Sequence, residues 1–106
     1  MVISSVLVVG DDVDAGVPAI ALAQQGLEVT LLGGTEDEPA QRAREAGVEV
    51  RVGTALVGFV TVDRHVEAEL SDGRIENYDA IVRCASGEQR VIAQPGAAAE
   101  VARLLA

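Results

Sequence analysis

Residues 4–34, SSVLVVGDDVDAGVPAIALAQQGLEVTLLGG, decide the fold of this chain. An aliphatic run over residues 6–9 stops at Gly10, an apolar segment of helical character follows, and a second aliphatic run over residues 29–32 ends in two glycines. This order predicts a strand, a tight turn, a helix and a second strand. Two strands joined through a helix lie parallel with a right-handed crossover. The Gly10 turn is therefore expected at the carboxyl edge of a parallel sheet, where open α/β sheets bind ligands.

The rest of the chain extends this unit. Residues 3–9 are almost continuously apolar, which is typical of a central strand covered on both faces. Gly26 is placed to end the first helix. Further along, the patterns predict a short helix from Thr35 to Gly47, a strand at 48–52, strands at 59–62, 66–70 and 75–78, a buried strand at 79–85, a short edge strand at 90–93 and a helix at 97–105. The Asp-Gly dipeptide at 72–73 is typical of a hairpin and indicates a β-meander.

The predicted fold class is therefore α/β. We expect a three-layer, Rossmann-like parallel sheet (βαβαβ) with a β-meander and a C-terminal strand and helix, all within one domain of residues 1–106.

The charge balance excludes some classes of partner. The chain has 17 acidic residues against 8 basic ones, all of them arginine, and a net charge of −9. Nucleic acid and anionic membranes require a basic patch, so neither is expected as a partner. No apolar run approaches the roughly 20 residues that span a bilayer and no secretory signal is seen, so we expect a cytoplasmic protein. An acidic, lysine-free chain suits a halophilic, high-salt cytoplasm, and codon bias in a GC-rich genome explains it equally well.

Three motifs resemble the Rossmann-type FAD/NAD(P)-binding domains of the pyridine nucleotide-disulfide oxidoreductases and related flavoproteins, over about residues 4–87. VLVVGDDVDAG followed by LAQQGLEVTLL stands where that family has a strand, GxGxxG/A, a helix, a glycine and a strand. AREAGVEVRVGT is similar to the family's helix that leads into a third strand. VEAELSDGRIENYDAIVRCASG, the most specific of the three, is similar to its strand, Asp-Gly turn, strand and terminal A-T-G.

The resemblance implies a cofactor site for FAD or NAD(P). Gly10, Asp12 and Ala15 would stand at the three fingerprint positions. The full set of expected cofactor-binding residues is Gly10, Asp11, Asp12, Ala15, Gly33, Gly34, Glu36, Ala85, Ser86 and Gly87. The resemblance assigns no catalytic residue within the single domain.

The sequence also departs from the family pattern. Asp12 replaces the glycine that lets the backbone approach a pyrophosphate, and a carboxylate about 6 Å from a phosphate costs roughly 2–3 kcal/mol at an effective dielectric of about 20. The second strand ends in Gly33 and Gly34 instead of an acidic residue that holds the ribose, and Glu36 would reach the ribose only if its loop folds back. The loop after Gly10 is thus open to three interpretations: a dinucleotide cradle, a turn and helix cap only, or a metal site formed by its aspartates.

Three further residues are candidates for a functional site. Cys84 falls in a buried strand and is expected to be a small core hydrophobe, and His65 is expected to face solvent in a turn. Arg83 is the polar residue of an otherwise apolar strand. It fits a sheet edge, an oligomer contact, a partner for a loop aspartate or a contact to a ligand phosphate.

Three functional hypotheses follow. The first is a stand-alone FAD- or NAD(P)-binding module of an oxidoreductase system that acts with a redox partner protein or as a homodimer, since hydride transfer requires a second surface. The second is a Rossmann-like domain without a cofactor that acts by self-association or protein interaction. The third is a domain resembling the S-adenosylmethionine-binding methyltransferases. A homodimer would cover the apolar sides of the second helix and of the helix ending at Leu105.

Overall fold

The first strand, β1 (Ser5–Gly10), is the centre of a five-stranded sheet with the strand order β3-β2-β1-β7-β8. In the computed structural model, residues 3–10, 16–33, 38–63, 65–85, 88–93 and 95–105 are described. The other strands of this sheet are β2 (Glu28–Gly33), β3 (Glu49–Val52), β7 (Ala80–Ala85) and β8 (Glu88–Ala93). All neighbours are parallel except β8, which pairs antiparallel with β7.

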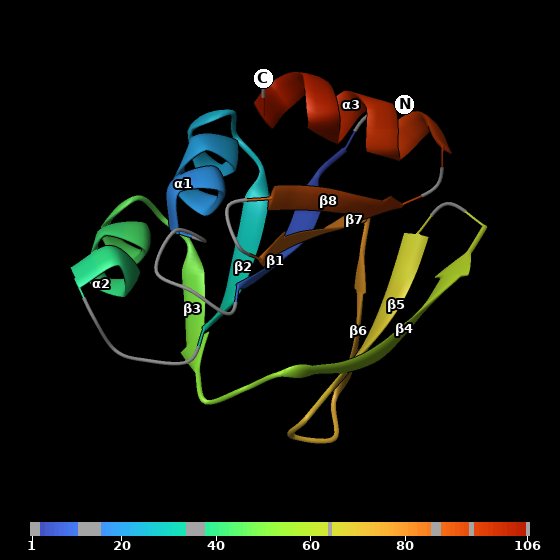
Figure 1. Ribbon diagram of the computed structural model, residues 1–106, viewed down its shortest axis with the longest axis horizontal. Coiled ribbons are helices and arrows are strands. Elements are labelled where there is room, and N and C mark those ends of the chain that lie inside the picture. The colour runs from blue at the N-terminus through green and yellow to red at the C-terminus, as the bar shows by residue number, and fades with distance from the viewer. Residues whose placement is uncertain are drawn as a thin grey trace.

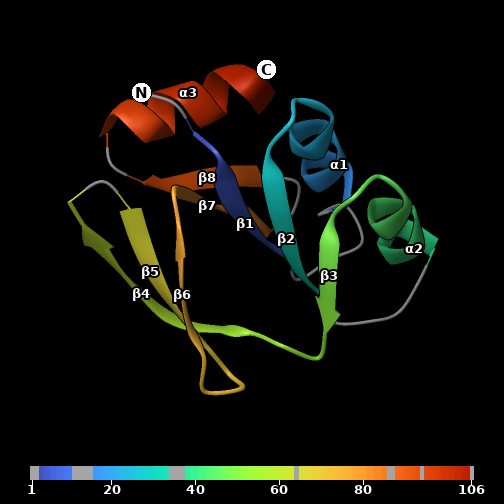
Figure 2. The same ribbon diagram turned by 180° about the vertical axis from the view of Figure 1, so that it is seen from behind.

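Two further layers cover the two faces of this sheet (Figure 1). The helices α1 (Gly16–Gln24), α2 (Glu38–Glu45) and α3 (Pro95–Leu105) pack on one face. The meander, formed by β4 (Leu56–Val62), β5 (His65–Leu70) and β6 (Ile75–Tyr78), packs on the other, as the reverse view also shows (Figure 2). The predicted three-layer α/β fold with a meander and a C-terminal strand and helix is thus confirmed.

Side chains of β1 point alternately to the two faces of the sheet and contribute to a hydrophobic core on each face. Val6 and Val8 pack with the helices, whereas Leu7 and Val9 pack with the meander, and Val6, Leu7 and Val8 are fully buried. A strand with apolar neighbours on both faces needs a continuous apolar run, which explains why residues 6–9 show no polar alternation. The prediction of a central first strand is confirmed.

Most predicted boundaries agree with the structure to within a few residues. Gly26 and Gly47 follow α1 and α2 with φ of +88° and +95°, the left-handed conformation that glycine adopts readily at helix C-termini. β8 begins two residues earlier than expected and pairs along its whole length, and α3 begins at Pro95. The expected helix cap, Thr35, lies outside the described residues.

Several of the apolar residues expected to face a second copy of the chain pack against the sheet of their own chain. In α3, Val101 is fully buried. Leu104 and Leu105 are partly buried against the core on the face of the sheet that the helices cover. In α2, Ala40 and Ala43 are buried as well. These described apolar side chains thus pack against the sheet of their own chain in full or in part, and the homodimer stays a prediction.

Asp79 joins the start of β1 to the start of β7. Its Oδ2 accepts hydrogen bonds from the backbone nitrogens of Ser4 (2.7 Å) and Ser5 (3.1 Å) and from the Ser4 hydroxyl (3.0 Å). Its own backbone nitrogen donates to the Ser5 carbonyl at 2.9 Å. Burial alone would raise the pKa of Asp79, but the hydrogen bonds from Ser4 and Ser5 outweigh it and lower the pKa below its usual value.

We expect Asp79→Asn to reduce the free energy of unfolding by about 1–2 kcal/mol at neutral pH, because the amide replaces a charged acceptor of three hydrogen bonds. Urea unfolding measures this, with Glu69→Gln, an exposed carboxylate of β5, as the matched control. Since the folded pKa of Asp79 is depressed, its contribution is present above the usual carboxyl pKa and is lost as the pH falls through the folded value. The difference between wild type and Asp79→Asn should therefore shrink in acid, and a constant difference down to pH 2 would contradict this role.

Candidate functional site

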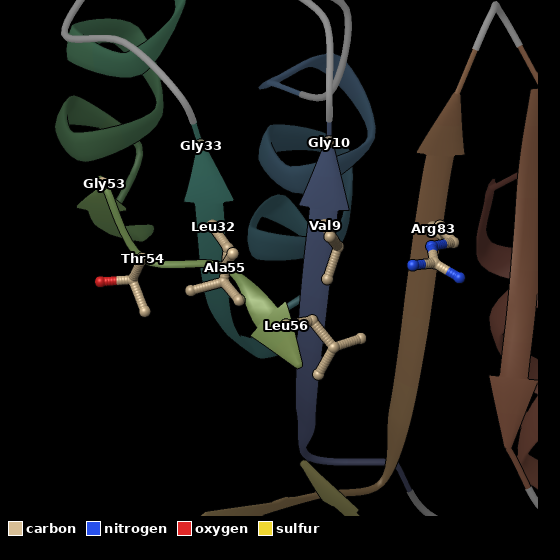
Figure 3. A pocket seen from close by; sticks show the side chains of 9 residues that line it. All are labelled: Val9, Gly10, Leu32, Gly33, Gly53, Thr54, Ala55, Leu56 and Arg83. Carbon is tan, nitrogen blue, oxygen red and sulfur yellow. The ribbon is translucent and has the colours of Figure 1, made fainter. Parts of the chain in front are cut away.

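A cavity of about 340 Å³ lies at the carboxyl edge of the parallel sheet, on the face that carries the meander (Figure 3). It is bounded by the ends of β1 and β2, by the connection from β3 to β4, and by one side chain of β7. The residues that line it are Val9, Gly10, Leu32, Gly33, Gly53, Thr54, Ala55, Leu56 and Arg83. This is the edge at which the sequence places a ligand site.

Glycines shape the mouth of this cavity. Gly33 pairs with Val52, and its carbonyl accepts a hydrogen bond from the Gly53 nitrogen at 3.0 Å. Gly53 has φ of +81°, which turns the chain away from β3 towards β4 and closes one side of the cavity. A Cβ on Gly33 would meet no atom of the described residues within 4 Å, so the described part of the chain leaves room at the end of β2.

Two of the predicted cofactor-binding residues, Gly10 and Gly33, line the cavity together. Ala85 ends β7 at the same edge of the sheet, one residue beyond the Cys84 that pairs with Gly10. The remaining predicted residues lie outside the described part of the chain, and their roles stay predictions: Asp11, Asp12, Ala15, Gly34, Glu36, Ser86 and Gly87.

The sequence does not predict two components of the cavity correctly. Residues 53–56 form one wall, and from the sequence they look like an ordinary loop that begins at Gly53 and ends before Gly58. One interpretation of Arg83 from the sequence is that its strand lies at a sheet edge. This interpretation is wrong, because β7 lies between β1 and β8. The Arg83 guanidinium instead lines the cavity, beside the partner residue Val9 of β1 (Figure 3). A polar residue in an apolar strand was the available signal.

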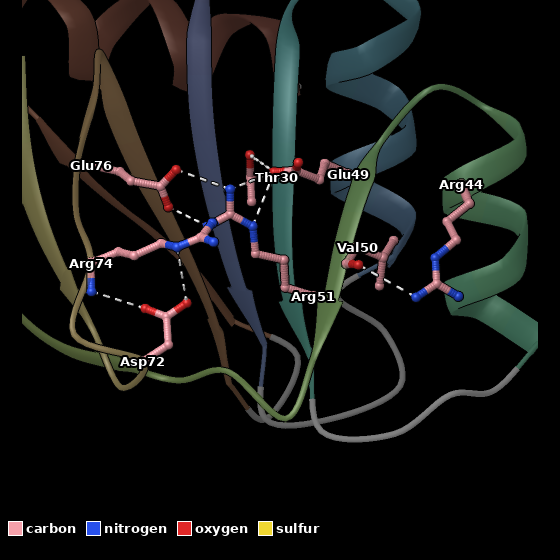
Figure 4. Close-up of polar contacts among 8 residues, drawn as sticks. All are labelled: Thr30, Arg44, Glu49, Val50, Arg51, Asp72, Arg74 and Glu76. Carbon is pink, nitrogen blue, oxygen red and sulfur yellow. Dashed lines mark hydrogen bonds and ion pairs between the residues drawn. The ribbon is translucent and has the colours of Figure 1, made fainter.

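A second, more polar hollow of about 370 Å³ lies between the meander and the amino-terminal ends of β1 and β2. Arg51 lines this hollow and joins its carboxylates (Figure 4). The Arg51 guanidinium donates to Glu76 of β6, with Nη2 2.9 Å from Oε1, and to Glu49 of its own strand, with Nη2 2.7 Å from Oε2. The Thr30 hydroxyl donates to the same Glu49 carboxylate at 3.5 Å.

These charges satisfy one another, so we interpret the Arg51 cluster as a clamp between the two sheets. The hydrogen bond to Glu76 is the main cause that raises the pKa of Arg51, and the same bond lowers the pKa of Glu76. The side chains of Arg51 and Glu76 are only 18% and 29% exposed. Solvent therefore screens this pair less than a surface ion pair.

We expect Arg51→Gln to lower the free energy of unfolding by about 1–2 kcal/mol, because it leaves two carboxylates without their cation. The control is Arg42→Gln, whose pair with Glu38 is 67% and 70% exposed and should contribute less than about 0.5 kcal/mol. Because the pKa of Glu76 is lowered, its part of this stabilisation is present above the usual carboxyl pKa and lost in acid. Equal destabilisation by the two variants in urea unfolding would show that Arg51 is not a clamp.

Cys84 and His65 lie on different sides of the sheet. Cys84 is buried among the side chains of the helical face, as predicted for a core residue. His65 begins β5 on the opposite side of the sheet, with Nε2 3.7 Å from Oε1 of Glu67. It belongs to a strand, and its Nε2 is buried, so the prediction of a solvent-facing turn residue is wrong for that atom. The sheet separates the two residues and rules out a thiol–imidazole pair.

Within the described ranges no group of three or more His, Cys, Asp and Glu side chains is arranged to hold a metal ion. The aspartates after Gly10, which raised the metal interpretation, lie outside those ranges. No described helix is long and apolar enough to cross a membrane.

Comparison with solved structures shows the same fold in parts of several larger proteins. The chain superimposes on LpdA from Mycobacterium tuberculosis with a TM-score of 0.66 and 18% identity, covering 95% of this chain and 24% of LpdA. It matches the flavoprotein disulfide reductase RclA from Escherichia coli with a TM-score of 0.65 and 15% identity, covering 92% of this chain and 23% of RclA. The halogenase PltM gives a TM-score of 0.68 and 11% identity over 77% of this chain and 35% of PltM.

These matches show a shared α/β fold, and the chain spans about a quarter to a third of each of these proteins. No protein-family model matches the sequence, and no curated protein is similar enough to indicate a family.

Proposed function

We propose that this chain is a dinucleotide-binding module, for FAD or NAD(P), of an oxidoreductase system. The observation that carries the proposal is the cavity at the carboxyl edge of the sheet, with Gly10 and Gly33 at the ends of neighbouring parallel strands. Parallel α/β sheets bind nucleotides at such an edge, where the backbone is accessible. The fold shared with the flavoprotein disulfide reductase RclA supports the same class of ligand.

In this proposal the module is not catalytic alone. The described residues of the cavity comprise glycines, aliphatic side chains, Thr54 and Arg83, without a described carboxylate, imidazole or thiol that would serve as general base or nucleophile. Hydride transfer also requires a second surface that holds the partner of the cofactor. We therefore propose that a redox partner protein or a second copy of this chain completes the reaction centre in the cytoplasm.

The proposal is tested by titrating the protein in high salt with FAD, NADH, NADPH and S-adenosylmethionine while following backbone amide resonances. We expect saturable shifts centred on Gly10 and Gly33 with one of the dinucleotides. Gly33→Leu would place a bulky side chain at the carboxyl end of β2, next to the proposed ligand, and should weaken binding at least about tenfold.

The matched control is Gly58→Leu in β4, where a side chain also meets open space but lies outside the cavity. It should leave the affinity unchanged. Saturable shifts with S-adenosylmethionine alone would replace the dinucleotide proposal with the methyltransferase-like alternative. The absence of shifts with all four ligands at millimolar concentration would reject cofactor binding.

A second candidate function, self-association, is favoured by the outer face of the meander, which we define as the side of β4–β6 turned away from the parallel sheet. Val60 and Ile75 are 58% and 67% exposed there, opposite Glu67 and Glu69 on β5. Exposed aliphatic side chains on a sheet favour an interface. The neighbouring carboxylates would repel a second copy of the chain at low salt.

We therefore expect a homodimer whose population grows with salt, measured by sedimentation at high protein concentration. Val60→Glu should shift the protein towards monomer, whereas Val17→Glu, at a valine of α1 that is also well exposed, should not. A monomer at high protein concentration and high salt would exclude this candidate.

A further inference from the structure

Two arginines face each other on the last two strands of the main sheet. Arg83 of β7 and Arg90 of β8 are direct partners in the antiparallel register. Directly opposed residues of an antiparallel pair point to the same face with their Cβ atoms about 5 Å apart. Both side chains are exposed, and Arg83 lines the cavity at the carboxyl edge.

This pair differs from the other described arginines. Those have partners within the chain: Arg42 with Glu38, Arg44 with the Val50 carbonyl, Arg51 with Glu49 and Glu76, Arg74 with Asp72, and Arg103 with Glu100 (Figure 4 shows three of these sets). Arg83 and Arg90 make no hydrogen bond or ion pair with any side chain that the structure describes, a set that leaves out the side chains of residues 85–89 and 93–98. Like charges directly opposite each other on a sheet destabilise it. In a chain with 17 acidic residues, two adjacent cations without described counterions need an explanation.

The position of the pair supplies that explanation. In the β1–β7 register Arg83 is the partner of Val9, the residue before the Gly10 turn (Figure 3). A planar guanidinium binds a phosphate through two parallel hydrogen bonds, and two guanidiniums side by side match a group with more than one negative charge. The cavity provides the space for that group next to Arg83.

We propose that Arg83 and Arg90 form a binding site for a phosphate or diphosphate group at the β7 side of the cavity. Where that group belongs to a dinucleotide, this inference rests on the proposed function. The arginine pair then explains how a sequence with aspartates after Gly10 is compatible with binding a dinucleotide. Asp12 in place of a fingerprint glycine weakens an ordinary backbone cradle, and the positive charge comes from the strands instead.

The test uses isothermal titration at low salt with three probes, inorganic pyrophosphate, FAD and NADH, on the wild type and on single variants. We expect Arg83→Gln and Arg90→Gln each to weaken pyrophosphate binding roughly tenfold, the effect of one lost charge-assisted contact. Arg83→Lys keeps the charge but not the planar fork and should give an intermediate loss. Arg42→Gln removes the same charge on α2, away from the cavity, and should leave the affinity unchanged.

A melting experiment provides a second, independent readout. Without ligand, Arg83→Gln should melt at or above the temperature of the wild type, because the repulsion with Arg90 is removed. Pyrophosphate should raise the melting temperature of the wild type and not that of the variant. If Arg83→Gln instead lowered the ligand-free melting temperature and left pyrophosphate affinity unchanged, the arginine would have a partner within the chain, such as an aspartate after Gly10, and the inference would be overturned.

The outcomes separate this inference from the proposed function. Equal FAD or NADH binding by wild type and Arg83→Gln would overturn the arginine site while the dinucleotide module stands. Arg83-dependent binding of pyrophosphate without binding of either dinucleotide would support a site for free phosphate and reject the dinucleotide module. No pyrophosphate binding, or the same loss in Arg42→Gln, would overturn the arginine site.

Discussion

The burial of β1 on both of its faces is the constraint on which the rest of this structure depends. Val6, Leu7 and Val8 are fully enclosed, and complete burial of an aliphatic side chain contributes about 1.5–3 kcal/mol. Neither layer alone covers the strand, because alternate side chains point to opposite faces. The helices and the meander are therefore both required, and the carboxyl end of β1, at Gly10, lies at the edge of the sheet where the cavity is.

The two ends of the meander-facing side of the sheet differ in their electrostatics. Near the amino-terminal ends of β1 and β2, Arg51 forms ion pairs with both Glu49 and Glu76 in the polar hollow. At the carboxyl end, Arg83 lines a cavity without a described acidic side chain. Charges that satisfy one another hold layers together, whereas unsatisfied charge beside an open cavity favours a ligand of opposite sign. A single face of the sheet thus combines one end at which charges hold two layers together with another end at which we propose that a ligand binds.

Local patterns were sufficient to predict most of the fold. The apolar run of residues 6–9, the glycines after each helix and the Asp-Gly turn at 72–73 each depend on a few neighbouring residues, and the structure places strands, helix ends and a hairpin there. The carboxyl-edge location of Gly10 and Gly33 followed from chain topology. The Arg51–Glu76 contact was not predictable, because it joins residues 25 apart through a register that the sequence does not specify. Arg83 was noticed as polar, but its partner Arg90 follows only from the β7–β8 register.

The hydrogen bonds between Asp79 and Ser5 join positions 74 residues apart, and this separation has a consequence for folding kinetics. The strand at the centre of the sheet belongs to the first part of the chain, yet one of its two neighbours, β7, follows only after both helices of the βαβαβ unit and the whole meander. Contacts of such long range are slow to form, because a large loop must close before they stabilise anything. Until β7 arrives, one hydrogen-bonding edge of β1 remains open to other chains. Chains in which β7 has not yet docked are consequently the species in which aggregation competes with folding, and faster docking of β7 favours the yield of native protein.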